Sequence, residues 1–436
     1  TRRSSDLTDN TGCAAAILSG SATASVSETL PSVSVDSQVD PSCANNDGAI
    51  NISVSNGQAP YAFAWTTGNG TGLNPGAEDQ TGLGAGTYEL VVTDDNGCQS
   101  TPATSATLTL PSGCALNYYW VGGSGLWSDF SNHWATTSGG NVFYNQVPTS
   151  MDNVFFDANS FPAGGTVTID ETIVYCRDMN WTGATNNPVL TGPADKQIWI
   201  YGSLALNSAM DWDIQGETRF RSFESGKTIQ SSGQSFDANV YFDGNGEWNF
   251  IDAFNAAGQL FLQSGTLRTQ GNNVSIAGLS FDNGSLFLSN SVVNLFSGLS
   301  TGNGASLDAG TSHVIFNNAS GLFASNNPTF HDVTFASVGN GEAHNCSVSG
   351  KMTFVGPGVY STNFSSTVNE IEFQQTGLIG SNSSPVPAPL FNTATFLGNG
   401  SFFGDNDFLA LNLASGHLYK FQSTFTTTIA TGGTLN

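Results

Sequence analysis

Short segments of alternating apolar and polar residues run along most of the chain. The alternation is clear at residues 49–54, 61–65 and 88–92, where every second side chain is apolar. A period of two predicts strands that bury one face. Turn-forming residues stand between these segments, and Asn96-Gly97 is a strong hairpin signal because both residues tolerate a positive φ. The pattern therefore predicts an all-β protein built from many short strands.

One segment of this pattern occurs twice. The sequence Leu-Thr-Asp-Asn-Thr-Gly-Cys at residues 7–13 returns as Val-Thr-Asp-Asp-Asn-Gly-Cys at residues 92–98. A repeated strand-and-turn module is typical of extended surface proteins. We interpret residues 1–31 as the C-terminal part of a preceding repeat. Residues 32–113 then form a complete immunoglobulin-like β-sandwich around Trp65.

A second kind of periodicity follows from residue 114 onward. Residues 279–285 align with residues 305–311 at an offset of 26 positions, and residues 258–262 align with residues 284–288 at the same offset. Short apolar strands between Gly and Asn corners, at a regular offset, predict one turn of a parallel β-helix per repeat. We therefore expect residues 114–436 to form a right-handed parallel β-helix, a solenoid with Phe and Leu stacked inside it.

The beginning of this region is rich in aromatic residues, namely Tyr118, Tyr119, Trp120, Trp127 and Trp134. A solenoid needs caps that cover its open strand edges. We interpret residues 115–157 as the N-terminal cap. The alternative is a carbohydrate-stacking platform, because aromatic faces bind the C–H surfaces of sugars.

Charge narrows the range of partners. The chain has 436 residues, of which 10% are charged, and its formal net charge is -24; no Lys or Arg stands between Arg3 and Arg177. Without a cationic surface it would be repelled by nucleic acid and by anionic lipid. No hydrophobic stretch is long enough to cross a bilayer. The acidity suits an exposed extracellular surface, and divalent-cation binding is the alternative.

Six cysteines are spread along the chain without any C-x-x-C pair: Cys13, Cys43, Cys98, Cys114, Cys176 and Cys346. This spacing favours disulfides in an oxidising compartment over a zinc site. Cys43 and Cys98 bracket one module, so a bond between them is our first expectation. In an immunoglobulin-like module these two residues could stand at opposite ends, and pairing between neighbouring modules is then the alternative.

Candidate chemistry is sparse. Asp94, Asp95 and Asn96, together with Asp47, offer oxygen ligands of the kind Ca²⁺ accepts. Asx residues beside Gly also serve the hydrogen bonds of their own turns, and that interpretation is favoured. Carboxylates are plentiful for a polysaccharide lyase or glycosidase, but few cations accompany them. We nominate no catalytic, cofactor-binding or metal-binding residue and expect a protein that is not an enzyme.

Several motifs in residues 32–113 resemble the SprB repeat of Bacteroidetes surface proteins. They are Cys43, Asn-Asp-Gly-Ala-Ile at residues 46–50, Ala-Pro-Tyr-Ala-Phe-Ala-Trp at residues 59–65, Leu-Gly-Ala-Gly-Thr-Tyr at residues 83–88 and Asp-Asp-Asn-Gly-Cys at residues 94–98. The resemblance implies a secreted, immunoglobulin-like module repeated along a very large gliding-motility adhesin that the type IX system exports. The opening of the region after Cys114 is similar to the start of β-solenoids in large proteins of this kind.

These observations together predict an extracellular, structural and adhesive segment of a cell-surface adhesin. It would be an internal fragment that binds polysaccharide or solid surfaces through many weak contacts. Its other expected partners are neighbouring repeats of the same chain and the secretion or motility machinery. The alternative is a secreted polysaccharide lyase or glycosidase whose site lies on the solenoid. The ligand and the oligomeric state stay open.

Overall fold

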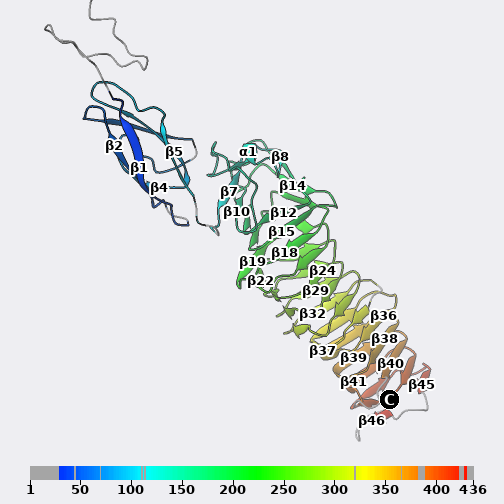
Figure 1. Ribbon diagram of the computed structural model, residues 1–436. Coiled ribbons are helices and arrows are strands. Elements are labelled where there is room, and N and C mark those ends of the chain that lie inside the picture. Colours follow the sequence, from blue (N-terminus) through cyan, green and yellow to red (C-terminus); the bar gives the residue numbers. More distant parts are fainter. Residues whose placement is uncertain are drawn as a thin grey trace, which may run out of the picture. The chain divides into compact units, whose positions relative to one another are not determined.

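The computed structural model is all-β and divides into two compact units, Thr1–Leu116 and Asn117–Asn436, called unit 1 and unit 2 (Figure 1). It describes residues 29–43, 46–68, 70–109, 111, 114–318, 321–364, 366–381, 388–421 and 427–429. Within these ranges a single short helix occurs, α1 (Phe130–His133). The predicted fold class, an immunoglobulin-like sandwich followed by a parallel β-solenoid, is confirmed in its architecture.

Unit 1 is a sandwich of two antiparallel three-stranded sheets. One sheet contains β1 (Ser32–Val39), β2 (Gly48–Ser55) and β4 (Gln80–Leu83), and the other contains β3 (Ala62–Thr67), β5 (Gly86–Thr93) and β6 (Thr104–Leu108). The alternating apolar side chains of both sheets meet in one core, which includes Ile50, Trp65 and Leu90. Trp65 is 2% exposed, and its indole N–H donates to the carbonyl of Ala77 over 3.0 Å. The predicted role of Trp65 as the centre of the module is therefore confirmed.

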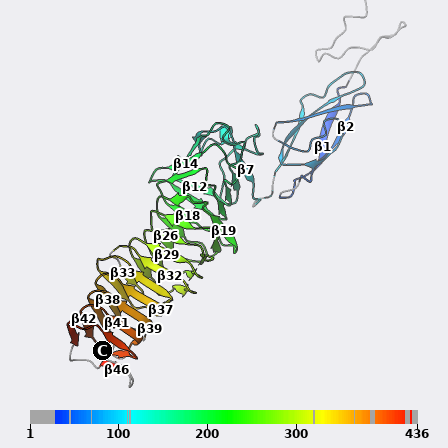
Figure 2. The same ribbon diagram turned by 180° about the vertical axis from the view of Figure 1, so that it is seen from behind.

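Unit 2 is a parallel β-solenoid of about 12 turns, whose strands follow one another along one axis (Figures 1 and 2). Its strands form three faces. Face A consists of β7 (Asn117–Trp120), β10 (Asn153–Phe155), β13 (Met179–Asn180), β16 (Leu204–Ala205), β19 (Lys227–Gln230), β22 (Glu247–Phe250), β25 (Thr266–Arg268), β28 (Ser285–Phe287) and β31 (Ser306–Asp308), with β9 (Trp134–Ala135) antiparallel at its edge.

Face B begins with a four-stranded sheet and continues in a longer one. The first contains β8 (Gly125–Leu126), β11 (Thr166–Thr168), β14 (Val189–Gly192) and β17 (Asp211–Ile214). The second contains β20 (Ser235–Phe236), β23 (Phe254–Ala256), β26 (Val274–Ile276), β29 (Val292–Leu295), β32 (His313–Phe316), β34 (Thr329–Phe330), β35 (Asp332–Phe335), β37 (Ser347–Phe354), β39 (Thr367–Phe373), β41 (Leu390–Phe396), β43 (Asn406–Phe408), β44 (Leu411–Leu413) and β46 (Thr427–Ile429).

Face C is a single sheet of thirteen strands. It contains β12 (Ile173–Cys176), β15 (Gln197–Ile200), β18 (Thr218–Phe220), β21 (Val240–Phe242), β24 (Leu260–Leu262), β27 (Leu279–Phe281), β30 (Leu299–Thr301), β33 (Gly321–Phe323), β36 (Gly341–His344), β38 (Gly358–Thr362), β40 (Gly377–Ser381), β42 (Gly400–Phe403) and β45 (Tyr419–Phe421). From β12 to β30, the strands of this face alternate between buried and more exposed side chains, as a solenoid wall requires.

The expected 26-residue turn is wrong. On face C, Leu260 pairs with Leu279 and Leu279 pairs with Leu299, so a turn takes 19 or 20 residues there. The offset of 26 relates Leu279 on face C to Ala305, which stands before Ser306 of face A. It therefore spans one turn plus the step to the next face. The error arises because strands on all three faces use the same alternation and the same Gly and Asn corners.

The interior of unit 2 contains the predicted aromatic stacking. Five phenylalanines from successive turns of face B, Phe316, Phe335, Phe354, Phe373 and Phe396, stack in series with ring centroids 4.6, 4.6, 4.8 and 4.7 Å apart. All five rings are buried. Identical side chains stack in this way because the parallel register places equivalent positions of consecutive turns directly above one another.

Four of the five aromatic residues named above at the start of unit 2 are buried as well, whereas Tyr119 is partly exposed and stacks on Phe155 at 5.0 Å. Trp120, Trp127 and Trp134 are at most 1% exposed, and the ring of Trp134 makes edge contacts with the other two at 5.0 and 4.9 Å. Strand β9 pairs with β7 and covers the outer edge of face A. The three Trp rings therefore cannot serve in the surface platform considered above, and their packing is what a cap over the first turn needs.

Candidate functional site

A line of large side chains runs along the outside of face C. Tyr175, Trp199, Arg219, Tyr241 and Phe261 occupy equivalent outward positions of β12, β15, β18, β21 and β24, each paired in register with the next. The residues on either side of each one in its strand are buried, so alternation directs these five outward. Neighbouring strands lie about 4.8 Å apart, which places the five side chains close together. We call these five residues the outer stripe.

The rings and guanidinium groups of the outer stripe contact one another. Tyr241 and Phe261 stack at 4.6 Å with an interplanar angle of 8°, and Tyr175 meets Trp199 at 5.7 Å and 87°. The guanidinium of Arg219 lies over the ring of Tyr241 at 4.1 Å, a cation–π contact. Parallel stacking turns the faces of Tyr241 and Phe261 toward each other, so this part of the stripe presents mainly ring edges to solvent.

The positive charges of this surface are paired. Arg219 forms ion pairs with Glu217 at 2.8 Å and with Asp243 at 2.9 Å, and Asp243 also pairs with Arg221 at 2.9 Å. Arg221 in turn lies over the ring of Trp199 at 4.2 Å. Burial lowers the pKa of Arg219, but the hydrogen bonds to Glu217 and Asp243 outweigh it, so the pKa is raised. Two carboxylates and two guanidiniums thus leave the surface locally neutral.

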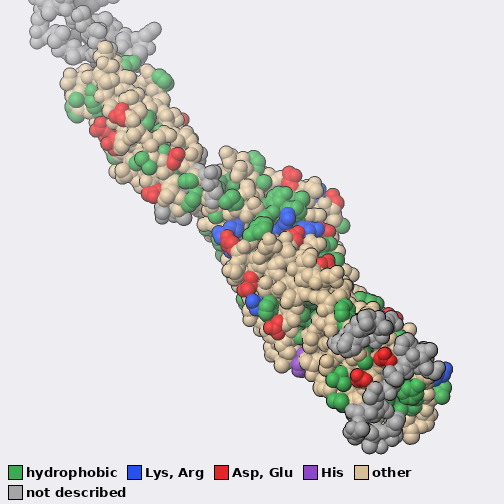
Figure 3. Space-filling view, turned by 60° about the horizontal axis from the view of Figure 1, so that its bottom comes forward, with side chains coloured by type: hydrophobic (Ala, Val, Ile, Leu, Met, Phe, Trp, Pro, Cys, Tyr) green, Lys and Arg blue, Asp and Glu red, His purple; other side chains and the backbone are tan. Residues whose placement is uncertain are grey.

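Amide side chains flank the stripe on face C. Gln197, Asn239 and Gln259 stand directly before or at the start of the strands that carry Trp199, Tyr241 and Phe261. The indole N–H of Trp199 donates to the side-chain oxygen of Gln197 over 2.8 Å. Figure 3 shows Lys and Arg side chains beside hydrophobic side chains on one part of unit 2. Aromatic, amide and paired charged groups together suit a ligand rich in hydroxyl groups.

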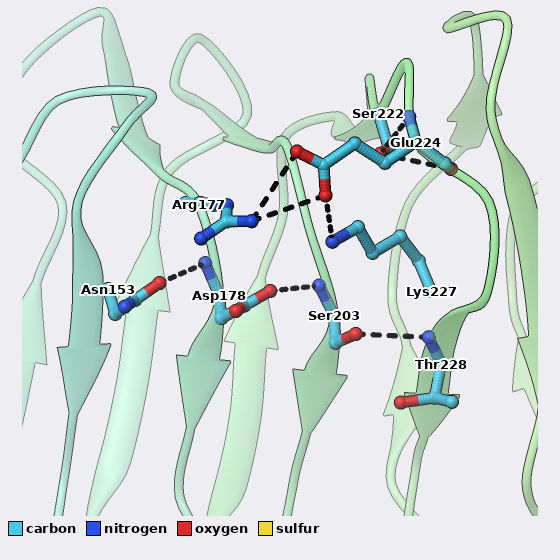
Figure 4. Close-up of polar contacts among 8 residues, drawn as sticks. All are labelled: Asn153, Arg177, Asp178, Ser203, Ser222, Glu224, Lys227 and Thr228. Carbon is cyan, nitrogen blue, oxygen red and sulfur yellow. Dashed lines mark hydrogen bonds and ion pairs between the residues drawn. The ribbon is translucent and has the colours of Figure 1, made fainter. Parts of the chain in front are cut away.

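A second charged cluster lies at the corner between faces C and A (Figure 4). Glu224 accepts from Arg177 over 3.2 Å and also pairs with Lys227, and these hydrogen bonds lower the pKa of Glu224. Beside it, Asp178 accepts the backbone N–H of Ser203 over 2.6 Å, and Ser203 accepts that of Thr228 over 3.1 Å. The side chains of Asp178 and Ser203 each accept a backbone N–H of the next turn, so this corner holds consecutive turns together.

Most of the Lys and Arg residues of unit 2 are paired with carboxylates. Seven of the eight Lys and Arg residues after residue 113 form ion pairs with carboxylates: Arg177, Lys196, Arg219, Arg221, Lys227, Arg268 and Lys351. A lyase acting on an acidic sugar needs cations that are free to neutralise the substrate. The seven Lys and Arg residues listed above are not free in this sense, because each is paired with a carboxylate of the chain.

The predicted calcium candidates serve turns of unit 1. The carboxylate of Asp94 accepts the backbone N–H groups of Gln58, Asn96 and Cys98 over 3.0, 3.1 and 2.8 Å. Asp47 accepts the backbone N–H and the hydroxyl of Ser42, both over 2.6 Å, at the other end of the module. These hydrogen bonds lower the pKa of both carboxyl groups.

The structure does not bring the calcium candidates together. Asp94 caps the turn after β5, whereas Asp47 stands before β2, and Asp95 and Asn96 are exposed beside Asp94. In the described part of the chain, no group of three or more His, Cys, Asp or Glu side chains is arranged to hold a metal ion. Calcium binding stays a prediction that these contacts do not test.

The expected bond between Cys43 and Cys98 is wrong, because Cys43 is bonded to Cys114 with their Cα atoms 5.2 Å apart. Cys43 follows β1 at the end of the module where β6 finishes, and Cys98 lies at the opposite end, where β5 finishes. Cys98 is itself disulfide-bonded. Cys13 lies outside the described residues. The alternation of strands identified the module, but the direction of each strand decided which cysteines meet.

Cys176 and Cys346 are free and fully buried in unit 2. Burial raises the pKa of the Cys346 thiol to about 12, and burial followed by the nearby charge of Asp178 raises that of Cys176 as well. Both thiols are therefore protonated and act as small apolar core groups.

Sequence reasoning missed the outer stripe. Its signal was present, since large outward side chains recur at residues 175, 199, 219, 241 and 261. These spacings vary between 20 and 24 residues, and an assumed turn of 26 residues does not align them. The wrong period therefore hid a surface where consecutive turns carry aromatic and cationic groups in register.

The fold and these sites define a class of protein, a disulfide-bonded β-sandwich module followed by a parallel β-solenoid. Residues 35–70, which include most of β1 and all of β2 and β3, match the SprB repeat family. No curated protein and no solved structure matches the chain. The SprB repeat suggests a cell-surface or extracellular protein, and the Cys43–Cys114 disulfide fits that location. No helix of the described residues is long and apolar enough to span a membrane.

Proposed function

We propose that this chain is an adhesive segment of a large cell-surface adhesin, a gliding-motility filament exported by the type IX system of a Bacteroidetes bacterium. The SprB repeat supports the surface location and the kind of protein. The observation that carries the adhesive role is the outer stripe, five large side chains in register on consecutive turns of an exposed sheet face. Neighbouring repeats and the export or motility machinery are its further partners in this proposal.

The partner that this surface fits best is a neutral polysaccharide. Arg219 and Arg221 are already paired with Glu217 and Asp243, so an anionic polymer finds no free cation there. The net charge of -24 repels such a polymer over longer distances. Ring edges give a sugar chain an apolar strip, and the amides beside them can bind its hydroxyl groups.

In this proposal the affinity for the polysaccharide comes from many weak contacts and not from one deep pocket. A flat sheet face buries little of any single sugar, so each contact is weak. A polysaccharide that runs over several turns, or over several copies of the chain on one cell, makes many such contacts at once. Linked weak contacts raise the overall affinity by orders of magnitude without any deep pocket.

We propose binding and not catalysis for unit 2. The support is the pairing of its cations with carboxylates at seven positions, which leaves those charges occupied. An assay for the release of reducing ends or unsaturated sugars from the same glycans separates the two functions. Product release that scales with protein concentration would replace the adhesive proposal with an enzymatic one.

The test is binding of the intact chain to a panel of neutral and acidic polysaccharides. The variant W199A/Y241A removes two rings of the outer stripe and leaves the buried core unchanged. Two aromatic contacts of about 0.5–1.5 kcal/mol each predict about a 5- to 150-fold loss of affinity for the neutral glycans that bind. The control F296A removes another exposed ring, 48% exposed between β29 and β30, and should bind like the unaltered chain. Equal binding by both variants would contradict the assignment of the stripe.

A further inference from the structure

The first and the last strand of unit 1 are bonded to each other near their C-terminal ends. Strands β1 and β6 run in the same direction and finish at the same end of the module. The side-chain amide of Gln38 donates to the carbonyl of Thr107 over 3.3 Å, and the carboxylate of Asp40 accepts the backbone N–H of Thr109 over 2.7 Å. The chain therefore begins its first strand at one end of the module and leaves its last strand at the other.

The Cys43–Cys114 disulfide joins these two strands just beyond their common end. Cys43 follows β1 by four residues, and Cys114 follows β6 by six. A continuous covalent path thus runs through β1, across the sulfur–sulfur bond and on to Leu116. Strands β2 to β6 lie outside this path, in a closed loop between two cysteines separated by 71 positions.

We infer that the disulfide makes unit 1 a nearly inextensible link, in which tension along the chain travels through β1 and bypasses the rest of the module. A strand already rises about 3.3 Å per residue, close to the maximum of about 3.3–3.6 Å for a stretched chain. Pulling on the ends of β1 therefore lengthens it very little. Where Cys43–Cys114 is the cross-link that carries the force, the fold of β2 to β6 is not in its path, so tension does not unravel it; Cys98, inside the closed loop, is also disulfide-bonded and is therefore removed in the test below.

The bond prevents a large extension of the chain, because the loop between Cys43 and Cys114 is long. Without the bond, unfolding of the module would release the 71 positions between the cysteines, about 240 Å of extended chain. With the bond, that length stays closed whatever the force. This inference rests on the proposed function only for the source of tension, since an adhesin fixed at both ends is pulled along its length.

The test is single-molecule force spectroscopy of the full chain, held by handles at residues 1 and 436. The background C13S/C98S removes the other two cysteines of unit 1, so that only the Cys43–Cys114 bond remains there. In this background we expect no extension event of about 240 Å from unit 1. Adding C43S/C114S should introduce one such event, while the events of unit 2 stay the same and serve as an internal reference.

A second measurement covers the case in which the chain lacking the bond does not fold. The background protein with its bond intact is held at constant force, and a small thiol is added. Cys43 is exposed, so a thiolate can attack a sulfur of the bond, form a mixed disulfide with it and release the other sulfur as a thiolate. We expect a step of about 240 Å whose rate rises with thiol concentration.

Two results would overturn the inference. One is an event of about 240 Å while the bond is intact. The other is the absence of a thiol-dependent step of that length. Neither result depends on whether the chain binds polysaccharide, so failure of the adhesive proposal and failure of this inference can be told apart.

Discussion

The stacked phenylalanines of unit 2 allow a quantitative test of what holds the solenoid together. Phe354 is 0% exposed, and its ring stacks on Phe335 at 4.6 Å and on Phe373 at 4.8 Å. Truncating a buried Phe to Ala costs about 3–5 kcal/mol because transfer energy is lost and a cavity remains. Two stacked pairs add to that loss, so we expect about 4–5 kcal/mol for Phe354→Ala.

The effect should be local, because each turn of a solenoid contacts only its neighbours. Hydrogen exchange followed by mass spectrometry resolves it by segment. Amides in β35, β37 and β39, which carry the three rings, should exchange about a thousandfold faster, since each 1.4 kcal/mol is a factor of ten. Amides of β2 and β5 in unit 1 should keep their rates.

The matched control is Phe223→Ala, which removes the same side chain from a surface position that is 73% exposed. Surface truncations usually change stability by less than about 0.5 kcal/mol. If Phe354→Ala altered exchange no more than Phe223→Ala, the buried Phe stack would not be what stabilises these turns, and the packing argument would fail.

Three further predictions concern single contacts. Removing the Cys43–Cys114 bond with C43S/C114S should destabilise unit 1 by about 4 kcal/mol, because the bond no longer restricts a loop of 71 positions in the unfolded chain. Hydrogen exchange at increasing urea concentrations measures the midpoint of unfolding of unit 1, and an unchanged midpoint would contradict this prediction. Asp94→Asn should cost about 1–2 kcal/mol at pH 7 and progressively less as the pH falls through the folded pKa of Asp94, which lies below its usual value because backbone N–H bonds outweigh burial; a cost independent of pH would refute it. Gly216→Ala should distort the corner before β18, since a Cβ there would lie 1.6 Å from the Lys196 carbonyl oxygen, at a cost of about 1–3 kcal/mol or more. Gly68→Ala, where a Cβ meets nothing within 4 Å, is its control in a melting experiment.

The sign of the Asp94 prediction follows from linkage. A carboxyl group whose folded pKa lies below its unfolded value of about 3.9 binds fewer protons when folded. Its contribution to stability is therefore complete above that unfolded value and is lost as the pH falls through the folded one. Asp47 has a lowered pKa for the same reason, so unit 1 as a whole should weaken in acid.

The candidate site was only partly within reach of sequence reasoning. Asp94 was correctly interpreted as a turn residue, because Asx-Gly chemistry depends on neighbours in the chain. The outer stripe was missed, although alternation alone marks Tyr175 and Trp199 as residues on one side of their strands. Which residues of consecutive turns lie next to each other depends on the number of residues in each turn. This number varies along the solenoid.

The sequence by itself determined the all-β class, the division into a sandwich module and a solenoid, the stacking of Phe inside the solenoid and the burial of Trp65. These features follow from alternation and turn chemistry, which act over a few residues. Only the tertiary structure decided the turn length, the partner of Cys43 and the assembly of the outer stripe. Each of these depends on register or strand direction between segments far apart in the chain, and the same short pattern on all three faces is compatible with several registers.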